Sequence, residues 1–226
     1  TQVVQAMERM RTMVQQNAST STELSGNAEG LLVQAEALQE AVSGFALAQE
    51  QSRDAQRPKF DITPRVQQAI HQEIAHIQEW ARHPMVIAAV EEQNRRGPIP
   101  GMDRARWRSL DPSDPLVRRL QESEAGQFLK TKVQQGNGHY TDAFLHAVHG
   151  EKVTFVRKTS YYIHAGLRKF DHPFQTGQPW QGVPEFDESC EQYSLQVSVP
   201  VLSTERPIGV LTVGLDLGSL EQAGAN

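Results

Sequence analysis

The sequence has few of the features on which redox, metal or membrane functions usually depend. It contains a single cysteine, Cys190, which excludes a disulfide within the chain and any metal site built from paired cysteines. It has no apolar run that approaches the length of a membrane span and no apolar segment typical of a secretory signal. It shows no phosphate-binding glycine loop and no dinucleotide-binding glycine motif. We therefore expect no cofactor, no metal and no enzymatic activity.

The sequence also lacks an excess of positive charge. Its 226 residues include 22 Lys and Arg against 27 Asp and Glu, a net charge of −5, so it offers no basic surface for nucleic acid. Only 38% of the residues are hydrophobic, which is low for a chain that folds entirely into a compact globule. The length allows one domain of ordinary size and an extended helix. Since the sequence begins at Thr1, we expect it to be a piece of a longer chain.

Apolar and small residues recur at alternating steps of four and three between Val3 and Phe45. This period of 3.5 is typical of a helix that supercoils against partner helices. The positions are Val3, Met7, Met10, Val14, Asn17, Ser21, Leu24, Ala28, Leu31, Ala35, Leu38, Val42 and Phe45. Because a single helix with one apolar stripe has no core of its own, residues 1–46 predict a coiled coil that forms a homodimer.

Two polar residues beside this seam, Gln16 and Glu23, lie seven residues apart among small side chains. Because they are seven residues apart, both share one heptad position outside the seam, so a modifying enzyme could reach them on one exposed stripe. The segments Met10–Ala18 and Ala28–Phe45 resemble the C-terminal methylation helix of methyl-accepting chemotaxis proteins. The resemblance implies deamidation and methylation at Gln16, and at Glu23, where Thr22 replaces the second Glu or Gln usual in the family. An ordinary coiled-coil linker with polar outer positions is the alternative interpretation.

Residues 47–61 are polar on all sides and include Pro58, which predicts a linker and a domain boundary. A second region follows at residues 62–221, with a short tail at residues 222–226. It opens with a helix that Thr63 caps and Pro64 begins. Its apolar stripe is Val66, Ile70, Ile74, Ile77 and Ala81, and its outer positions are Gln67, Gln68, Gln72, Glu73 and Gln78. Further helices are expected after Pro84, around Arg104–Leu110 and from Asp114.

After Gly136 the hydrophobic period changes from helical to two. Strands are expected at Tyr140–Val148, Val153–Thr159, Tyr193–Val201 and Ile208–Leu217, and a loop at residues 177–184. Helices followed by hairpins predict an α+β fold, an antiparallel sheet with helices packed on it. His146 and His149 have a spacing that a metal pair could use in a helix, but on a strand this spacing sends the two rings to opposite faces. We expect them to be ordinary core or surface histidines.

The segments Gly138–Tyr140, Gln196–Val201 and Ile208–Leu217 resemble the PAS-like sensor fold called Cache or PDC. The segments Thr159–Tyr162 and Phe186–Ser189 fit recurring parts of that group. The resemblance implies a ligand such as a small organic acid, amino acid or amine, bound between the sheet and the loops that cover it. Tyr161 and Ala165-Gly166-Leu167 depart from the usual pattern, which leaves the ligand class open.

A pocket of this kind needs a few polar groups that converge among apolar walls. The candidates are Arg157, Tyr161, Tyr162, His164, Lys169, Trp180, Asp187, Tyr193 and Gln196. Arg157 could pair with a ligand carboxylate through two parallel hydrogen bonds. In the alternative interpretation, the aromatic residues pack in the core, Arg157 pairs with an acidic neighbour and Asp187 caps a turn.

Together the two resemblances imply a chemoreceptor fragment on the cytoplasmic side of the membrane. Its partners would be a small-molecule ligand, a second copy of the chain, the chemotaxis kinase and its coupling protein, and the receptor methyltransferase and methylesterase. Two alternatives remain open. The chain could be a structural dimerisation or scaffold domain without a ligand, or the sensor module of a histidine kinase or cyclase.

Overall fold

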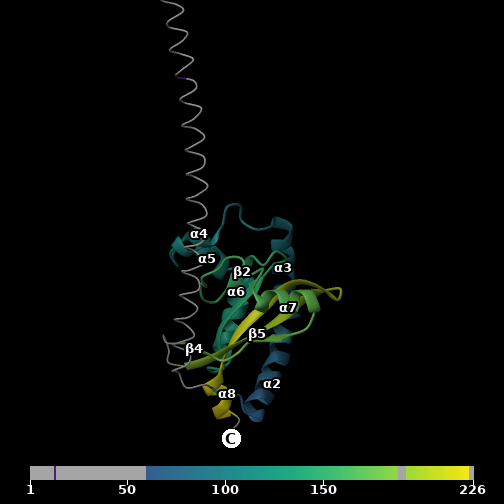
Figure 1. Cartoon of the computed structure of the whole chain (residues 1–226). Helices are drawn as coiled ribbons and strands as arrows, with labels where there is room; N and C mark the ends of the chain where they lie inside the picture. Colours follow the sequence, from purple (N-terminus) through teal and green to yellow (C-terminus); the bar gives the residue numbers. More distant parts are fainter. Residues whose placement is uncertain (1–12, 14–59, 188–191, 224–226) are drawn as a thin grey trace, which may run out of the picture. The chain divides into compact units, whose positions relative to one another are not determined.

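The computed structural model describes residues 13, 60–187 and 192–223. The predicted coiled coil, most of the linker, the methylation residues Gln16 and Glu23, and Cys190 lie outside the described residues. The chain divides into two units, residues 1–59 and residues 60–226, and the second contains the sheet and helices shown in Figure 1.

The second unit opens with α2 (Pro64–Ala81), which begins where the sequence predicts. The hydroxyl of Thr63 accepts a hydrogen bond from the backbone N–H of Val66 at 3.2 Å, and Pro64 occupies the first turn. The predicted apolar stripe packs into the core, although Ile74 is only partly buried. The sequence predicts that Glu73 lies on the outer face of this helix. That prediction is wrong, because Glu73 is buried, with only 8% of its surface exposed.

The remaining helices follow the expected order with one correction. The helix expected from Asp114 is two helices, because Ser123 interrupts it and caps the second one. The helices are α3 (Pro84–Arg96), α4 (Arg104–Ser109), α5 (Pro115–Gln121), α6 (Glu124–Gln135), α7 (Arg168–Thr176) and α8 (Leu217–Ala223).

The sheet has six strands, and every pairing in it is antiparallel. The strands are β1 (Tyr140–His146), β2 (Lys152–Phe155), β3 (Trp180–Gln181), β4 (Glu185–Asp187), β5 (Gln192–Ser203) and β6 (Arg206–Asp216). Their order is β2-β1-β6-β5-β3, and β4 also pairs with β5. This arrangement confirms the α+β class. The expected loop at 177–184 contains β3, and β2 ends at Phe155 rather than Thr159.

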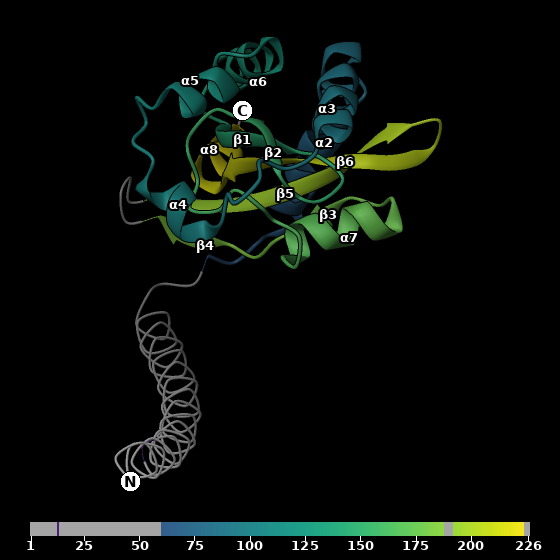
Figure 2. The same cartoon turned by 90° about the horizontal axis from the view of Figure 1, so that it is seen from above.

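The two faces of the sheet are covered by different elements. Helices α2, α3 and α6 pack on one face, which we call the helix face, and α7 packs on the other, the α7 face (Figure 2). Alternation along β1, β5 and β6 sends leucine and valine side chains to the helix face, where they form the main core. The same alternation sends polar side chains to the α7 face, and several of these are also buried.

Candidate functional site

Four basic side chains gather on the α7 face, and we call them the basic cluster. They are His146 of β1, Lys152 of β2, His164 of the segment before α7, and Lys169 of α7. His146 and Lys152 are paired across the β1–β2 hairpin, so they share a face of the sheet. The first three are at most 1% exposed, and Lys169 is partly buried.

The members of the basic cluster surround the ring of Phe144. The nitrogen atoms of Lys152 and Lys169 lie 4.6 Å and 5.4 Å from the centre of that ring. The imidazole rings of His146 and His164 lie 4.0 Å apart, centre to centre. Lys169 is also held by a hydrogen bond from its Nζ to Oε1 of Gln196 on β5, at 3.0 Å.

Several buried polar atoms in and near the basic cluster have no hydrogen-bond partner among the described residues. They are both ring nitrogens of His146, Nζ of Lys152, Nδ1 of His172 and Oε1 of Glu151. The His164 ring meets no partner at hydrogen-bond geometry, although the backbone of Tyr161 acts on it. A buried polar group without a partner costs about 1–3 kcal/mol, and more if it is charged. So many unpartnered groups in one place are unusual for a core whose only role is structural.

Burial shifts the acid–base properties of the basic cluster toward its uncharged forms. It lowers the pKa of Lys152 to about 7, with a smaller contribution from Lys169, while the Asp142 carboxylate opposes the shift. Burial and the charges of the two lysines lower the pKa of His164 to about 2. The pKa values of His146 and Lys169 are lowered by burial in the same way. A bound anion would act in the opposite direction and favour the protonated forms.

Local backbone structure holds His164 over the sheet. The backbone N–H of His164 donates to the carbonyl of Gly150 at 2.7 Å, and the N–H of Lys152 donates to the carbonyl of Tyr162 at 3.0 Å. Gly150 has a φ of 79°, and a side chain there would collide with the backbone of Ala165. Gly150 is therefore needed twice: it allows the predicted tight turn, and it leaves room for the segment of residues 162–165 that covers the sheet.

The structure brings some of the predicted site residues together. His164, Lys169 and Gln196 meet in or beside the basic cluster. Tyr161 lies next to it, with its ring 6.1 Å from that of His164. Tyr162 is buried behind it against Trp107, and its hydroxyl accepts a hydrogen bond from the N–H of Ile99 at 3.2 Å. Their predicted role in ligand binding remains a prediction.

Other predicted site residues lie elsewhere. Arg157 is exposed beyond the end of β2, and its guanidinium donates to the carbonyl of Thr141. Trp180 is partly buried on the short edge strand β3. Tyr193 belongs to the helix face, where it packs against Phe60 and also contacts Phe186. Asp187 ends β4, and its side chain lies outside what the structure describes.

Four residues of the site were not predicted: Asp142, Phe144, His146 and Lys152. The available signal is the alternation of Asp142, Phe144 and His146 along β1, which gives them one face. His146 is buried and His149 is exposed, so the two rings do diverge as their spacing predicts. Asp142 is the acidic neighbour of the site, and its Oδ1 accepts hydrogen bonds from the N–H groups of Ala143 and Arg157 at 2.8 and 3.0 Å.

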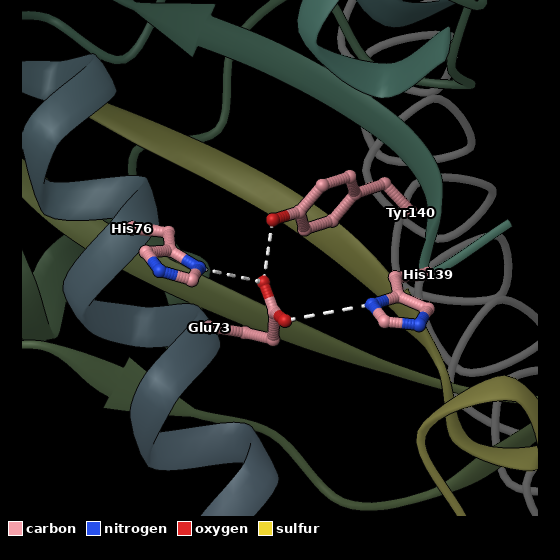
Figure 3. A network of polar contacts seen from close by, with 4 residues as sticks. All are labelled: Glu73, His76, His139 and Tyr140. Atoms are coloured by element: carbon pink, nitrogen blue, oxygen red, sulfur yellow. Dashed lines mark hydrogen bonds and ion pairs between the residues drawn. The ribbon is translucent and has the colours of Figure 1, made fainter. Parts of the chain in front are cut away.

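A second cluster of polar residues lies on the helix face and joins α2 to the start of β1. It consists of Glu73, His139 and Tyr140, and we call it the α2 latch. The Tyr140 hydroxyl donates to Oε2 of Glu73 at 2.5 Å, and Nδ1 of His139 lies 3.5 Å from Oε1 (Figure 3). His76 of α2 approaches the same carboxylate at 3.4 Å. Burial and the Glu73 carboxylate raise the pKa of Tyr140, which keeps the phenol protonated as a donor. Strand β1 thus carries Tyr140 at one end and His146 at the other.

A hollow of about 570 Å³ lies apart from the basic cluster, on the side of α3 and α5. Its lining includes apolar residues such as Ala89, Leu120 and Val153 and charged residues such as Glu92 and Arg119. Within the described part of the chain, no three or more His, Cys, Asp or Glu side chains gather as metal ligands would. None of the described helices is long and apolar enough to cross a membrane.

No protein-family model and no curated protein sequence matches the chain. Among solved structures, the chain is similar to the ligand-binding domain of the Pseudomonas aeruginosa amino acid chemoreceptor PctC in complex with GABA, at 13% identity and a TM-score of 0.41. It is also similar to the ligand-binding domain of the Campylobacter jejuni chemoreceptor Tlp3 with 4-methylisoleucine, at 14% identity and a TM-score of 0.39. A third neighbour is the sensor domain of the Vibrio cholerae histidine kinase DctB, at 15% identity and a TM-score of 0.36.

These matches are partial on both sides. They cover 70%, 70% and 71% of this chain and 58%, 56% and 60% of the respective neighbours. The chain therefore matches less than two thirds of each of these structures. The neighbours themselves are ligand-binding sensor domains of chemoreceptors and the sensor domain of a kinase.

Proposed function

We propose that residues 60–226 form a Cache-like sensor domain that binds a small organic anion at the basic cluster. The observation that carries this proposal is the set of buried nitrogen atoms without partners on one covered face of the sheet. A carboxylate or similar group that accepted hydrogen bonds there would remove the cost of leaving them unpaired. Small-molecule sites characteristically combine apolar walls with a few converging polar groups, as Phe144 and the basic cluster do here.

The groups at the site favour an anion over a cation. Lys152 and Lys169 can carry positive charge there and the two uncharged histidines can each donate an N–H, whereas the carboxylate of Asp142 is already engaged by two backbone N–H groups. Lys169 and Gln196 reach the site from α7 and β5, so a ligand that bridges them would connect the covering helix to the sheet. Binding would then close α7 onto the α7 face.

Strand β1 offers a route from the ligand to α2. Phe144 and His146 belong to the site, and Tyr140 on the same strand donates to Glu73 of α2. The chain leads from α2 back to the predicted coiled coil of residues 1–46. In our proposal, ligand occupancy shifts α2 through the α2 latch and changes packing at the seam. A coupling free energy of about 1–3 kcal/mol would bias a two-state bundle.

The proposed context is a chemoreceptor. Residues 1–46 would supply a dimeric methylation helix, modified at Gln16 and Glu23 by the receptor methyltransferase and methylesterase. Signalling would reach the chemotaxis kinase and coupling protein through a hairpin tip upstream of Thr1. A sensor that follows this helix would lie on the cytoplasmic side. Such a tip in the upstream sequence would distinguish this context from a histidine kinase or cyclase.

Thermal unfolding of the full chain with a panel of small acids, amines and neutral analogues tests the sensor proposal. We expect one or more acids to raise the midpoint, since a ligand at 100 times its Kd adds about 2.7 kcal/mol of stability. K169Q should abolish this shift. K130Q is the matched control, because Lys130 is exposed on α6 and its replacement removes the same charge. If no acid stabilises the wild-type chain, the scaffold interpretation is correct.

Disulfide crosslinking tests the proposed coupling. Single cysteines at Leu31 and Leu38, placed in a C190S background, should crosslink at different rates with and without an acid that binds. Y140F removes the hydroxyl that joins β1 to Glu73, and it should abolish this difference while leaving the binding shift in place. Unchanged rates in the chain with Tyr140 intact would contradict the coupling.

A further inference from the structure

The amine of Lys152 differs chemically from the rest of the basic cluster. It is fully buried and its Nζ lies 4.6 Å and 5.5 Å from the ring centres of Phe144 and Phe155. It has no hydrogen-bond partner among the described residues. With a pKa of about 7, about half of this amine is unprotonated at neutral pH. A desolvated lysine next to a second cationic group is the form that attacks carbonyl carbons.

Groups that can move protons lie beside this amine. His146 and His164 are both close enough to Lys152 for its charge to act on them. Their lowered pKa values keep both rings uncharged at neutral pH. The ring nitrogens of His146 make no hydrogen bond to another described residue, whereas a backbone hydrogen bond with Tyr161 acts on His164. An uncharged imidazole without a partner can accept a proton from one atom and return it to another.

We propose that Lys152 captures a small oxo acid as an imine, while Lys169 pairs with the acid's carboxylate. This inference deepens the proposed function, because it uses the same anion site and adds a covalent bond to the ligand. It specifies the ligand class as a short carboxylic acid with an aldehyde or ketone group near the carboxylate. Asp142, which also faces Lys152, stays bound to its two backbone donors.

The covalent step needs no oxidant, reductant or co-reactant. The lone pair of the unprotonated Nζ attacks the carbonyl carbon while the second C–O bond opens onto oxygen. One proton of the attached nitrogen passes through the imidazole of His146 to that oxygen, which gives a neutral carbinolamine. The second nitrogen proton follows the same route to the hydroxyl group, which leaves as water while the C=N bond forms. Hydrolysis reverses every step, so removal of the free oxo acid would reset the site.

Reductive trapping on the wild-type full chain tests this proposal without relying on the folding of a variant. The chain is incubated with pyruvate or glyoxylate and sodium cyanoborohydride, and adducts are located by intact mass and peptide mapping. We expect one reduced adduct per chain, at Lys152, with Lys130 on the exposed face of α6 unmodified. Lactate, which has the carboxylate of pyruvate and no carbonyl, should slow the labelling by competition. K169Q should slow it at least tenfold at low pyruvate concentration.

The outcomes separate this inference from the proposed function. If pyruvate and lactate both stabilise the chain and no adduct forms at Lys152, the imine is overturned and the anion site stands. Labelling of Lys130 and Lys152 at equal rates also overturns it, because the site then contributes nothing to reactivity. If other acids bind while pyruvate and glyoxylate neither bind nor react, the oxo-acid class is wrong. If no acid of any kind binds, the proposed function fails as well.

Discussion

The two faces of the sheet are both buried, yet they are built from different chemistry. On β6, Leu211 faces α2 and α3 in an apolar core, whereas its neighbour Thr212 faces the opposite side and bonds to Ser198. The helix face gains stability from the apolar side chains that it buries. The α7 face buries histidine and lysine nitrogens without partners, which costs stability. We infer that the helix face maintains the fold and that the α7 face is kept for binding.

The largest effect is expected on the helix face. Leu211 is fully buried, so L211A should lower the free energy of unfolding by about 2–5 kcal/mol through lost transfer energy and a residual cavity. Urea unfolding of the full chain measures this loss. A similar loss in K152M, at an equally buried residue of the other face, would remove the distinction between the two faces.

On the α7 face, a substitution at a buried residue is expected to change the free energy of unfolding in the opposite direction. K152M replaces a buried amine that has no partner by an apolar side chain of similar length. It should leave the free energy of unfolding unchanged or raise it by about 1–4 kcal/mol, as other apolar replacements of buried charged groups do. The same variant should bind organic anions at least tenfold more weakly, which corresponds to about 1.4 kcal/mol. Urea unfolding and calorimetric titration measure the two effects, and loss of both stability and binding would show that Lys152 is structural.

The pH dependence of stability should sharpen the comparison. Lys152 titrates at about 7 in the folded chain and near 10.5 ordinarily, so the unfolded chain binds more protons between these values. The free energy of unfolding should therefore rise with pH above about 7, by at most about 1.4 kcal/mol per pH unit. It should fall as the pH drops below 6.5, because the folded pKa of His164 is lowered to about 2.

Urea unfolding at a series of pH values, in wild type, K152M and K130M, checks this dependence. The rise above neutral pH should become much smaller in K152M, where only the lowered pKa of Lys169 still contributes, and persist in full in K130M, whose lysine is exposed. The fall at acidic pH should persist in both variants. A rise that survives in full in K152M would mean that another group causes it.

The smallest effect on the free energy of unfolding is expected for two buried hydroxyl groups of the α7 face that bond to each other. The hydroxyls of Ser198 and Thr212 lie 2.8 Å apart and are buried. S198A and T212V should each cost about 1 kcal/mol, because each leaves the other hydroxyl unpaired. The double variant should cost less than the sum, and a double-mutant cycle by urea unfolding measures this coupling. Additive costs would indicate that the two hydroxyls do not depend on each other.

The sequence was informative where local patterns decide structure. The cap at Thr63, the period-two strands that became β1, β5 and β6, and the α+β class were all predictable, because they depend on near neighbours. Glu73 was placed outside because it follows the polar side of α2, but Tyr140, distant in sequence, covers it. Two-residue β3 exists only because β5 lies beside it, so its own sequence gives no signal.

The site was predictable only in part for a similar reason. His164, Lys169 and Gln196 were named as candidates from their position beside the expected sheet, and the structure places them together. Lys152 and His146 were missed because an alternating strand with polar residues is usually solvated on its polar face. Here Phe170 of α7 packs on His146 and the segment that leads to α7 pairs with the backbone at Lys152, and the sequence of β1 and β2 does not reveal this cover.

The contact between Gly150 and Ala165 limits how this protein could be redesigned. Any side chain at residue 150 would push against Ala165, next to His164, so the hairpin turn and the position of His164 must change together. Lys169 and Gln196 carry no such constraint, since their contact joins two side chains rather than two backbones. An engineer seeking altered selectivity should vary that second pair first and keep the glycine.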